Sequence, residues 1–263
     1  MNIIVLIKQV PDTTDVKLDP KTGSLIREGV ESIINPDDRH ALEAAISLKK
    51  AEGGKVTVLS MGPPQTIDAL SEAIGMGANE AILLSDSAFA GADTWSTSFT
   101  LGKSIEKIGR YDLIFCGRQA IDGDTAQIGP QVADYLHVPQ VTYVFDIEKI
   151  QKKTIIVKKR LEDGYERVQC NLPALLTVIG ELNVPQYPMV GRLIDACKEK
   201  SPIKIWNASD IGVQARDVGL EGSFTQVIKT FAPKFKRQGE MLEGDARKVA
   251  GTLVEKLKEN KLI

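Results

Sequence analysis

The residues best suited to ligand chemistry lie in a polar loop, Ala120–Gly129, which holds two aspartates on either side of a glycine. An apolar run, Leu113–Cys116, precedes this loop, and apolar residues spaced by four follow it as far as Leu136. This order predicts a strand, a loop and a helix, with the loop at the carboxyl end of the strand, where parallel α/β sheets bind ligands. Such connections usually take about 2–6 residues, so the length of this one indicates a bound group.

A nucleotide is the group that the loop predicts. The free N–H groups and the positive dipole end of a helix N-terminus suit phosphate, and Thr125–Gln127 would present backbone N–H groups to it. Asp122 and Asp124 either cap the helix or hydrogen-bond to ribose hydroxyls. Gly123 is expected to need a positive φ, which a β-branched residue resists. A plain connector is the alternative interpretation of this loop.

A second loop, Phe89–Thr97, has similar chemistry and also follows a short apolar run. Asp93 is placed to cap the next helix, and Thr94 or Thr97 would face phosphate if the loop binds a ligand. An ordinary helix start explains the same residues, so both interpretations stay open.

Composition excludes several other kinds of chemistry. The formal net charge of −2 argues against a broad basic surface for nucleic acid, and the two histidines, His40 and His137, are too few for a histidine-rich metal site. The three cysteines lack CxxC spacing, which predicts a reducing compartment without structural disulfides. The apolar start of the chain is too short for a signal sequence or a membrane span. We therefore expect a cytoplasmic protein without a membrane span.

Strand and helix patterns alternate over the first ~140 residues, which predicts right-handed βαβ units in an open, mostly parallel sheet with helices on both faces. Asn35 and Pro36 mark a strong helix start, with Asn as the cap. Neither GxGxxG nor GxxxxGK[ST] occurs. The expected strands are 2–10, 55–61, 81–84 and 113–116, and the expected helices begin near 36, 67, 95 and 125.

The pattern changes after Pro139. Two alternating runs, 154–160 and 165–172, flank Asp163-Gly164, which predicts a hairpin. With the apolar run 174–179 they should extend the sheet by antiparallel strands. We expect one α/β domain over 1–185 and a C-terminal arm over 186–263 that ends in a helix with an apolar stripe. That helix packs either on a partner or back on its own domain.

Six segments of the chain together carry a resemblance to a known family. They are IKQVPD (7–12), NPDDRHALEAA (35–45), LSMGPP (59–64), GMGANEAILLSD (75–86), GRQAIDGDTAQIGP (117–130) and LPALLTVIGELNVPQYP (172–188). They resemble the beta subunit of electron-transferring flavoprotein, occur in that family's order and span nearly three quarters of the chain. The resemblance implies an α/β domain whose C-terminal arm wraps an alpha subunit, which carries a flavin on a mobile domain.

The resemblance also implies an adenine nucleotide between four loops. The cofactor-binding residues it implies, with those of the second loop, are Leu6, Asn35, Pro36, Asp37, Asp38, Met61, Ala92, Asp93, Thr94, Thr97, Ala120, Ile121, Asp122, Gly123, Asp124, Thr125, Ala126, Gln127, Ile128, Gly129 and Gln131. No residue is assigned as catalytic or as a metal ligand, because a flavin carries the chemistry and the protein supplies binding and electrostatics.

Two sequence segments, FAGADTWSTS (89–98) and DGDTAQIGPQ (122–131), are similar to those of the family's bifurcating branch, which is found in anaerobes. In that branch the beta subunit binds FAD and receives electrons from NADH. One electron passes to ferredoxin or flavodoxin and the other to an acyl-CoA dehydrogenase. An NADH-dependent enoyl-CoA reductase activity is then expected only in the assembled complex.

Two alternatives stay open. One is an AMP-binding beta subunit of a non-bifurcating carrier, which moves single electrons between acyl-CoA dehydrogenase and a quinone reductase. The other is a nucleotide-binding regulatory module without redox chemistry.

The family resemblance also implies a recognition loop that docks on the acyl-CoA dehydrogenase. The spacing from Pro185 places Val190 at its tip, with Met189 and Leu193 beside it. The usual Leu is absent from the tip position. The helical spacing of these residues also fits ordinary core packing.

Overall fold

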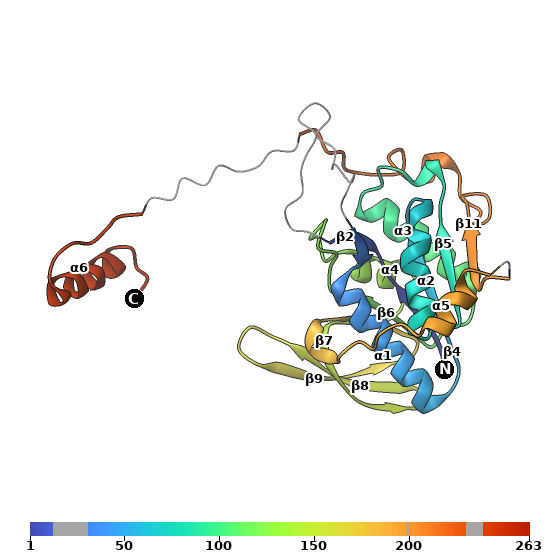
Figure 1. Ribbon diagram of the computed structural model, residues 1–263, viewed down its shortest axis with the longest axis horizontal. Helices are drawn as coiled ribbons and strands as arrows, with labels where there is room; N and C mark the ends of the chain where they lie inside the picture. Colours follow the sequence, from blue (N-terminus) through green and yellow to red (C-terminus); the bar gives the residue numbers. More distant parts are fainter. Residues whose placement is uncertain (13–30, 199, 230–238) are drawn as a thin grey trace. The chain divides into compact units, whose positions relative to one another are not determined.

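The structure is a computed structural model that describes residues 1–12, 31–198, 200–229 and 239–263. By its contacts the chain divides into two compact units, Met1–Ile228 and Lys229–Ile263. The first unit contains the sheet, and the described residues of the second contain one helix (Figure 1).

Nine strands of the described residues form one sheet, in the order β11-β5-β4-β1-β6-β10-β7-β8-β9. Neighbours from β11 to β7 pair in parallel, as βαβ crossovers require. These strands are β1 (Asn2–Leu6), β4 (Lys55–Met61), β5 (Glu80–Leu84), β6 (Leu113–Gly117), β7 (Gln140–Gln151), β10 (Ala174–Val178) and β11 (Ile203–Trp206). β6 and β10 are buried along their whole length, which explains their continuous apolar sequences.

Antiparallel strands extend one edge of the sheet, as the sequence predicts for the hairpin. The expected antiparallel place of the run 174–179 is wrong, because β10 lies between β6 and β7 and pairs with both in parallel. β8 (Thr154–Arg160) pairs with both β7 and β9 (Tyr165–Asn171), and Asp163-Gly164 lies in the turn between β8 and β9. A separate two-stranded sheet joins β2 (Gln9–Pro11) to β3 (Ser32–Ile34). Figure 1 shows the β7–β9 ribbon projecting beside α1.

Helices cover both faces of the sheet, which confirms the predicted fold class. α1 (Pro36–Glu52) and α2 (Ile67–Met76) pack on one face through Leu42 and Leu70. α3 (Thr94–Ile108) and α4 (Ile128–Tyr135) pack on the other through Ile105 and Val132. Apolar side chains of the strands alternate between the two cores. Short 3-10 turns lie at Pro64–Thr66, Ser87–Phe89, Gly180–Leu182 and Ala215–Asp217.

Several expected boundaries are wrong. The first strand ends at Leu6 rather than at residue 10, because the N–H of Lys8 is donated to a carboxylate and not to a neighbouring strand. β7 was not expected, and its two register shifts explain why the alternation in its sequence is irregular. β11 has only four residues, which is too short for a clear pattern. The spacing predicts that Gly75 and Gly77 together close the second helix, but Gly75 lies inside α2, and Gly77 alone ends it.

The second unit contains α6 (Ala246–Glu259), which begins where Asp245 caps it by accepting two backbone N–H groups. The final helix that the apolar stripe predicts is therefore present. Among the helices of the described ranges, none combines the length and apolar character needed to cross a bilayer.

Candidate functional site

The order of the strands places a topological switch point between β1 and β6. The chain moves from β1 to β4 and β5 on one side, then returns through α3 to β6 on the other side of β1. The loops that follow β1 and β6 therefore diverge at the carboxyl edge of the sheet, which is where open α/β sheets bind their ligands. The predicted loop 120–127 follows β6 at this edge.

A buried carboxylate joins the two strand ends at the switch point. Asp38, in the first turn of α1, accepts the N–H of Lys8 at 2.8 Å and the N–H of Gly117 at 2.8 Å. Burial raises the pKa of Asp38 to about 7, although the hydrogen bonds from Gly117, Lys8 and Asn35 act to lower it. Both carboxylate oxygens thus bind the protein backbone, and Asp38 positions the ends of β1 and β6.

Asn35 and Lys8 fasten the loop that follows β6. The Asn35 amide donates to the carbonyl of Gln119 at 2.9 Å and accepts the N–H of Ile121 at 3.1 Å. The Lys8 ammonium pairs with Asp122 at 2.7 Å. α1 begins at Pro36 as predicted, but the expected cap is wrong, because the Asn35 side chain makes no capping bond and binds this loop instead.

The loop itself holds two residues in a strained conformation. Asp124 has φ of 51° and Ala126 has φ of 54°, and the left-handed region costs a residue with a Cβ about 1–2 kcal/mol. Gly123 is not among the residues with positive φ, so the expected role for that glycine is wrong. Non-glycine residues held in this region cluster at functional sites, and this strain favours a binding role for the loop.

The same conformation delays the start of the helix. α4 begins at Ile128 and not at Thr125, because residues in the left-handed region cannot continue into a right-handed helix. Asp122 and Asp124 do not cap it. Gln127 occupies the cap position, and its side chain makes no capping hydrogen bond within the described residues. The N–H groups that the first turn of α4 keeps for a ligand are those of Ile128 and Gly129, since Pro130 has none and Gln131 donates to the carbonyl of Gln127.

Polar side chains link the first turns of α3 and α4. The Thr94 hydroxyl donates to Gln127 Oε1 at 3.0 Å, and Gln131 Nε2 donates to Thr94 Oγ1 at 3.4 Å. Ser98 donates to Gln131 at 3.3 Å. In the same turn of α3, Ser96 Oγ is buried without a hydrogen-bond partner among the described residues. The two predicted loops therefore meet, and they present hydroxyl and amide groups together.

Asp93 caps α3 as predicted, since its Oδ1 accepts the N–H of Ser96 at 2.9 Å. Its other oxygen accepts two hydrogen bonds from Thr225, at 3.0 Å each. Burial acts to raise the pKa of Asp93, but these hydrogen bonds lower it. Both oxygens of Asp93 are thus engaged by the protein, while its neighbour Ala92 is half-buried in the loop.

The remaining predicted residues lie at or near this edge. Leu6 ends β1 and Met61 ends β4, and both contribute to the core beneath α3 and α4. Asp37 faces Arg118, with 3.7 Å between Nε and the carboxylate. Thr97 lies one turn into α3, and Gly129 packs so closely that a Cβ there would stand 2.6 Å from Thr177.

The predicted docking residues lie on a different element. Met189 precedes α5 (Val190–Ala196), which packs against α2, and the N–H of Met189 donates to the carbonyl of Gly75 at 3.0 Å. Val190 is 71% exposed. Leu193 is only partly exposed and lies against Gly75. The structure therefore separates these residues from the predicted cofactor loops.

Some residues that shape the site were not predicted from the sequence. Lys8, Gly117 and Gln119 act through the ends of strands, and their partners are 30 to 114 residues away in the chain. Residues 219–225 reach Asp93 from far along the sequence. Lys8, Gly117 and Gln119 do lie in two of the segments that carry the family resemblance, 7–12 and 117–130, and this was the signal that could have identified them.

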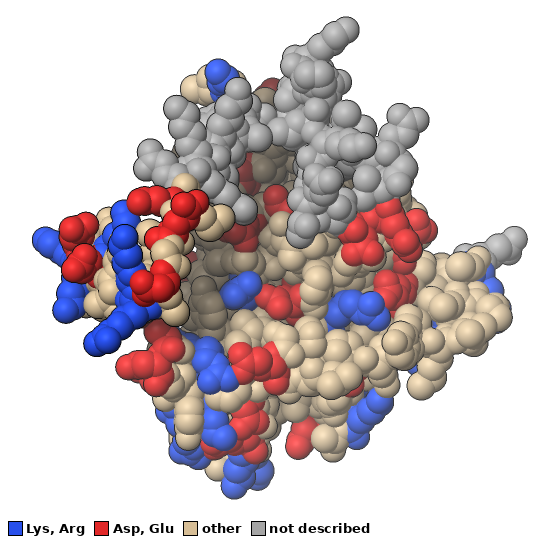
Figure 2. All heavy atoms as spheres, turned by 60° about the vertical axis from the view of Figure 1, so that its left-hand side comes forward, with Lys and Arg blue, Asp and Glu red and all other residues tan. Residues whose placement is uncertain are grey.

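The surface charges are mixed. On the face in Figure 2, basic and acidic side chains of the described residues are interspersed. No group of three or more His, Cys, Asp or Glu among the described residues could hold a metal ion.

The doubly wound sheet, with the first turns of α3 and α4 linked by hydrogen bonds at its carboxyl edge, defines an open α/β protein of the architecture in which ligands bind at the switch point. The electron transfer flavoprotein domain model matches residues 22–211. The electron transfer flavoprotein subunit beta of Thermoanaerobacterium thermosaccharolyticum is 54% identical over the whole of both chains. Subunit CarD of the caffeyl-CoA reductase-Etf complex of Acetobacterium woodii is also 54% identical, again over both whole chains. The electron transfer subunit gamma of acryloyl-CoA reductase from Anaerotignum propionicum is 40% identical over both.

This chain belongs to the electron transfer flavoprotein family, as a beta subunit. The resemblance predicted from the sequence segments is thereby confirmed. Membership implies an alpha-subunit partner and a dehydrogenase or reductase complex.

Proposed function

We propose that this beta subunit binds FAD and works in an electron-bifurcating complex. With its alpha subunit it would accept electrons from NADH and divide them between ferredoxin or flavodoxin and an acyl-CoA dehydrogenase. The observation that carries the proposal is the full-length similarity, at 54% identity, to a subunit named for a caffeyl-CoA reductase-Etf complex.

The residues at the carboxyl edge fit an adenine dinucleotide. The uncapped first turn of α4 offers N–H donors that suit a pyrophosphate. Thr94, Gln127 and Gln131 offer hydroxyl and amide groups that suit ribose or ribityl oxygens. The buried Ser96 hydroxyl lacks a partner in the described part of the chain, so a further acceptor or donor has a place there.

When bound, FAD would supply the two-electron and one-electron chemistry. This chain's own residues bind and orient it. Asp38 and Asn35 fix the strand ends and the loop after β6. The hydrogen bonds of Asn35 and the Lys8–Asp122 ion pair hold that loop, with its strained residues Asp124 and Ala126, in one conformation before the ligand arrives, which lowers the ordering cost of binding.

In this proposal the complex works in the cytoplasm, where the three free cysteines stay reduced. The arm after residue 185 includes the recognition segment 189–193 and the second unit. The arm would hold the alpha subunit, and the exposed face of α5 would meet the dehydrogenase. NADH-dependent enoyl-CoA reduction would belong to the assembled complex and not to this chain alone.

Cofactor analysis of the alpha–beta heterodimer tests the proposal. We expect two flavins per heterodimer, and we expect NADH to bleach flavin absorbance within seconds without any dehydrogenase. One flavin together with bound AMP, and no bleaching by NADH, would overturn the proposal in favour of a non-bifurcating carrier. A colourless heterodimer would point to a module without redox chemistry.

A pair of matched variants assigns the site. Thr94→Val removes a hydroxyl that joins α3 to α4 and should lower the flavin content to about one per heterodimer. Thr154→Val removes a hydroxyl of similar exposure in β8, which bonds only to Gln151 at 3.4 Å, and should keep both flavins. Equal flavin content in the two variants would remove Thr94 from the proposed site.

A further inference from the structure

The last residues of the first unit are fastened to the start of α3. We call residues Gly219–Thr225 the strap. The N–H of Leu220 donates to the carbonyl of Ala90 at 3.0 Å, and the N–H of Asp93 donates to Ser223 Oγ at 2.8 Å. Thr225 donates both its N–H and its hydroxyl to Asp93 Oδ2, at 3.0 Å each.

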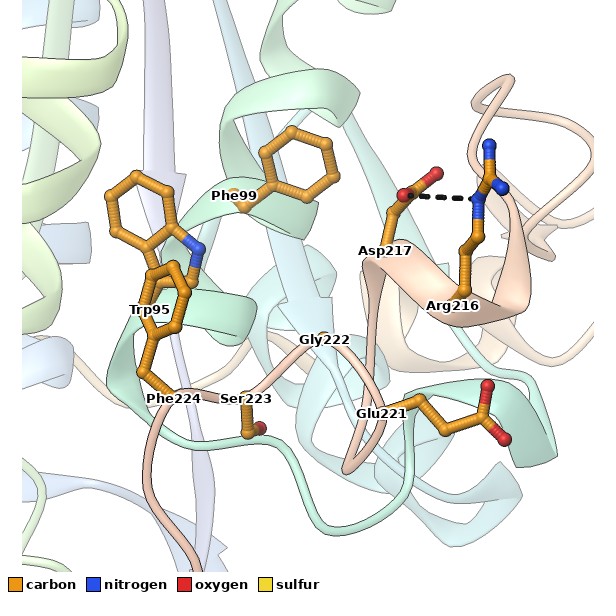
Figure 3. A pocket seen from close by; sticks show the side chains of 8 residues that line it. All are labelled: Trp95, Phe99, Arg216, Asp217, Glu221, Gly222, Ser223 and Phe224. Carbon is orange, nitrogen blue, oxygen red and sulfur yellow. Dashed lines mark ion pairs between the residues drawn. The ribbon is translucent and has the colours of Figure 1, made fainter.

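Aromatic packing adds to these hydrogen bonds. The ring centroids of Trp95 and Phe224 are 5.4 Å apart, and Figure 3 shows the two rings side by side where the strap passes the first turn of α3. An open groove of about 320 Å³ lies here, lined by Trp95 and Phe99 of α3, by residues 216–217 and by residues 221–224 of the strap. Gly219 permits the close approach, because it has φ of 60° and a Cβ there would stand 2.0 Å from the carbonyl of Ala88.

Asp93 therefore serves two structures at once. One oxygen caps α3 through Ser96, and the other holds Thr225. Three residues beyond Thr225, the first unit ends at Ile228. Phe224 is 80% exposed and Ile228 is 98% exposed. Val227 is 82% exposed as well, and three large apolar side chains exposed within five residues favour a contiguous apolar surface that a protein partner covers.

We propose that Asp93 is a positioning residue that couples nucleotide binding at α3 to binding of the alpha subunit. The inference rests on the proposed function, because it takes the first turn of α3 as part of the nucleotide site and the exposed side chains of Phe224 and Ile228 as part of the partner's site. A partner that covers Phe224 and Ile228 favours the fastened strap. The fastened strap fixes Asp93, and Asp93 fixes the α3 turn that carries Thr94.

The coupling is reciprocal by thermodynamic necessity. The nucleotide should tighten binding of the alpha subunit by the same factor as the alpha subunit tightens binding of the nucleotide. Typical coupling factors between sites are about 5- to 150-fold, and the few partly exposed bonds of the strap favour a value of about tenfold.

The test compares nucleotide dissociation constants in the isolated full chain and in the heterodimer, with FAD and AMP as separate probes. In the wild type, the heterodimer should bind about tenfold more tightly. Asp93→Ser keeps a good helix cap but loses the bonds to Thr225. Thr225→Val keeps the backbone N–H and loses the hydroxyl. The ratio of nucleotide affinity in the heterodimer to that in the isolated chain should fall toward one in Asp93→Ser. In Thr225→Val it should fall only in part.

Thr154→Val, in the distant hairpin, is the control and should keep the wild-type ratio. An unchanged affinity ratio in both Asp93→Ser and Thr225→Val, or a wild-type ratio of one, would overturn the coupling. Equal weakening of the isolated chain and the heterodimer by Asp93→Ser would also overturn it, because Asp93 would then contact the nucleotide directly. If only AMP binds, the proposed bifurcating function fails, and the ratio measured with AMP decides the coupling.

Discussion

Asp38 Oδ1 accepts the backbone N–H of Gly117 at 2.8 Å, and a Cβ at residue 117 would stand 2.5 Å from the same oxygen. It would also stand 2.6 Å from the Cβ of Asp37. A glycine is therefore required where β6 ends against the first turn of α1. The contact brings the two elements close enough for one carboxylate to hold both strand ends at the switch point.

We expect Gly117→Ala to destabilise the protein by about 1–3 kcal/mol, since overpacking at a rigid contact forces the backbone to move. Urea unfolding followed by circular dichroism measures this free energy. Gly191→Ala is the matched control, because a Cβ in α5 at that position meets no atom within 4 Å, and a helical Gly→Ala change stabilises by up to about 1 kcal/mol. Equal stability of the two variants would show that the contact at Gly117 can relax.

Most of the fold follows from sequence periodicity, and the reason is burial. β4 and α1 show the periods of a buried strand and an amphipathic helix, and both lie within a residue or two of the expected bounds. β11 and β7 were missed, because a short edge strand and a strand with register shifts carry weak local patterns. Their places depend on pairing with β5 and β10, which are distant in sequence.

The site was less predictable than the fold. Loop 120–127 was found because its length and residue types are unusual, but its conformation was not. The left-handed residues are Asp124 and Ala126. The sequence instead directs attention to Gly123, because glycine adopts a positive φ most readily. Side chains such as Asn35 have two possible uses, a cap or a long-range bond, and only tertiary structure decides between them.

The raised pKa of Asp38 predicts how stability changes with pH. The folded pKa is about 7 and the ordinary value is 3.8, so the folded state binds more protons than the unfolded state between these values. The contribution of Asp38 to the free energy of unfolding is then fully present below pH 4. It is lost as the pH rises to 7, and the loss is roughly 4 kcal/mol at most. Burial raises the pKa of Asp37 too, so it acts in the same direction.

Asp38→Asn isolates this contribution. The groups that face Asp38 are the N–H donors of Lys8 and Gly117, the Asn35 amide, the Asp37 carboxyl and the buried Cys116 thiol, whose pKa burial raises. They are common to both proteins, so the difference in unfolding free energy reports Asp38. We expect the variant to gain stability relative to wild type as pH rises from 4 to 7, measured by urea unfolding at several pH values. A relative loss over that range would mean that the two N–H bonds outweigh burial.

The strain at Ala126 predicts an unusual effect of glycine. Ala126→Gly removes the Cβ from a left-handed residue and should stabilise the protein by about 1 kcal/mol. Ala126→Val should destabilise it, because a β-branched residue resists this conformation. Ala90 is the matched control, since its φ is −64°, and Ala90→Gly should cost about 0.5–1 kcal/mol through chain entropy alone. Thermal unfolding of the three variants measures the signs, and a loss of stability in Ala126→Gly would contradict the strain.

The two sides of α5 predict which substitutions weaken docking on the dehydrogenase and which lower the stability of the fold. Val190 and Ile194 are 71% and 57% exposed and lie four residues apart, on one side of the helix. Leu193 instead packs toward α2, where its Cδ2 would stand 2.7 Å from a Cβ at Gly75. We expect Val190→Ala and Ile194→Ala to weaken docking on the dehydrogenase by about 1–2 kcal/mol each, and to leave the free energy of unfolding and the flavin content unchanged.

Leu193→Ala should lower the free energy of unfolding by about 2 kcal/mol, because it removes a partly buried side chain from the α2–α5 contact. Dehydrogenase titrations at fixed heterodimer concentration measure docking, since a docking defect raises the dehydrogenase concentration needed for half-maximal electron transfer without changing the limiting rate. Urea unfolding of the same three proteins measures stability. If Val190→Ala and Ile194→Ala transfer electrons like the wild type at low dehydrogenase concentration, the exposed side of α5 is not the docking surface.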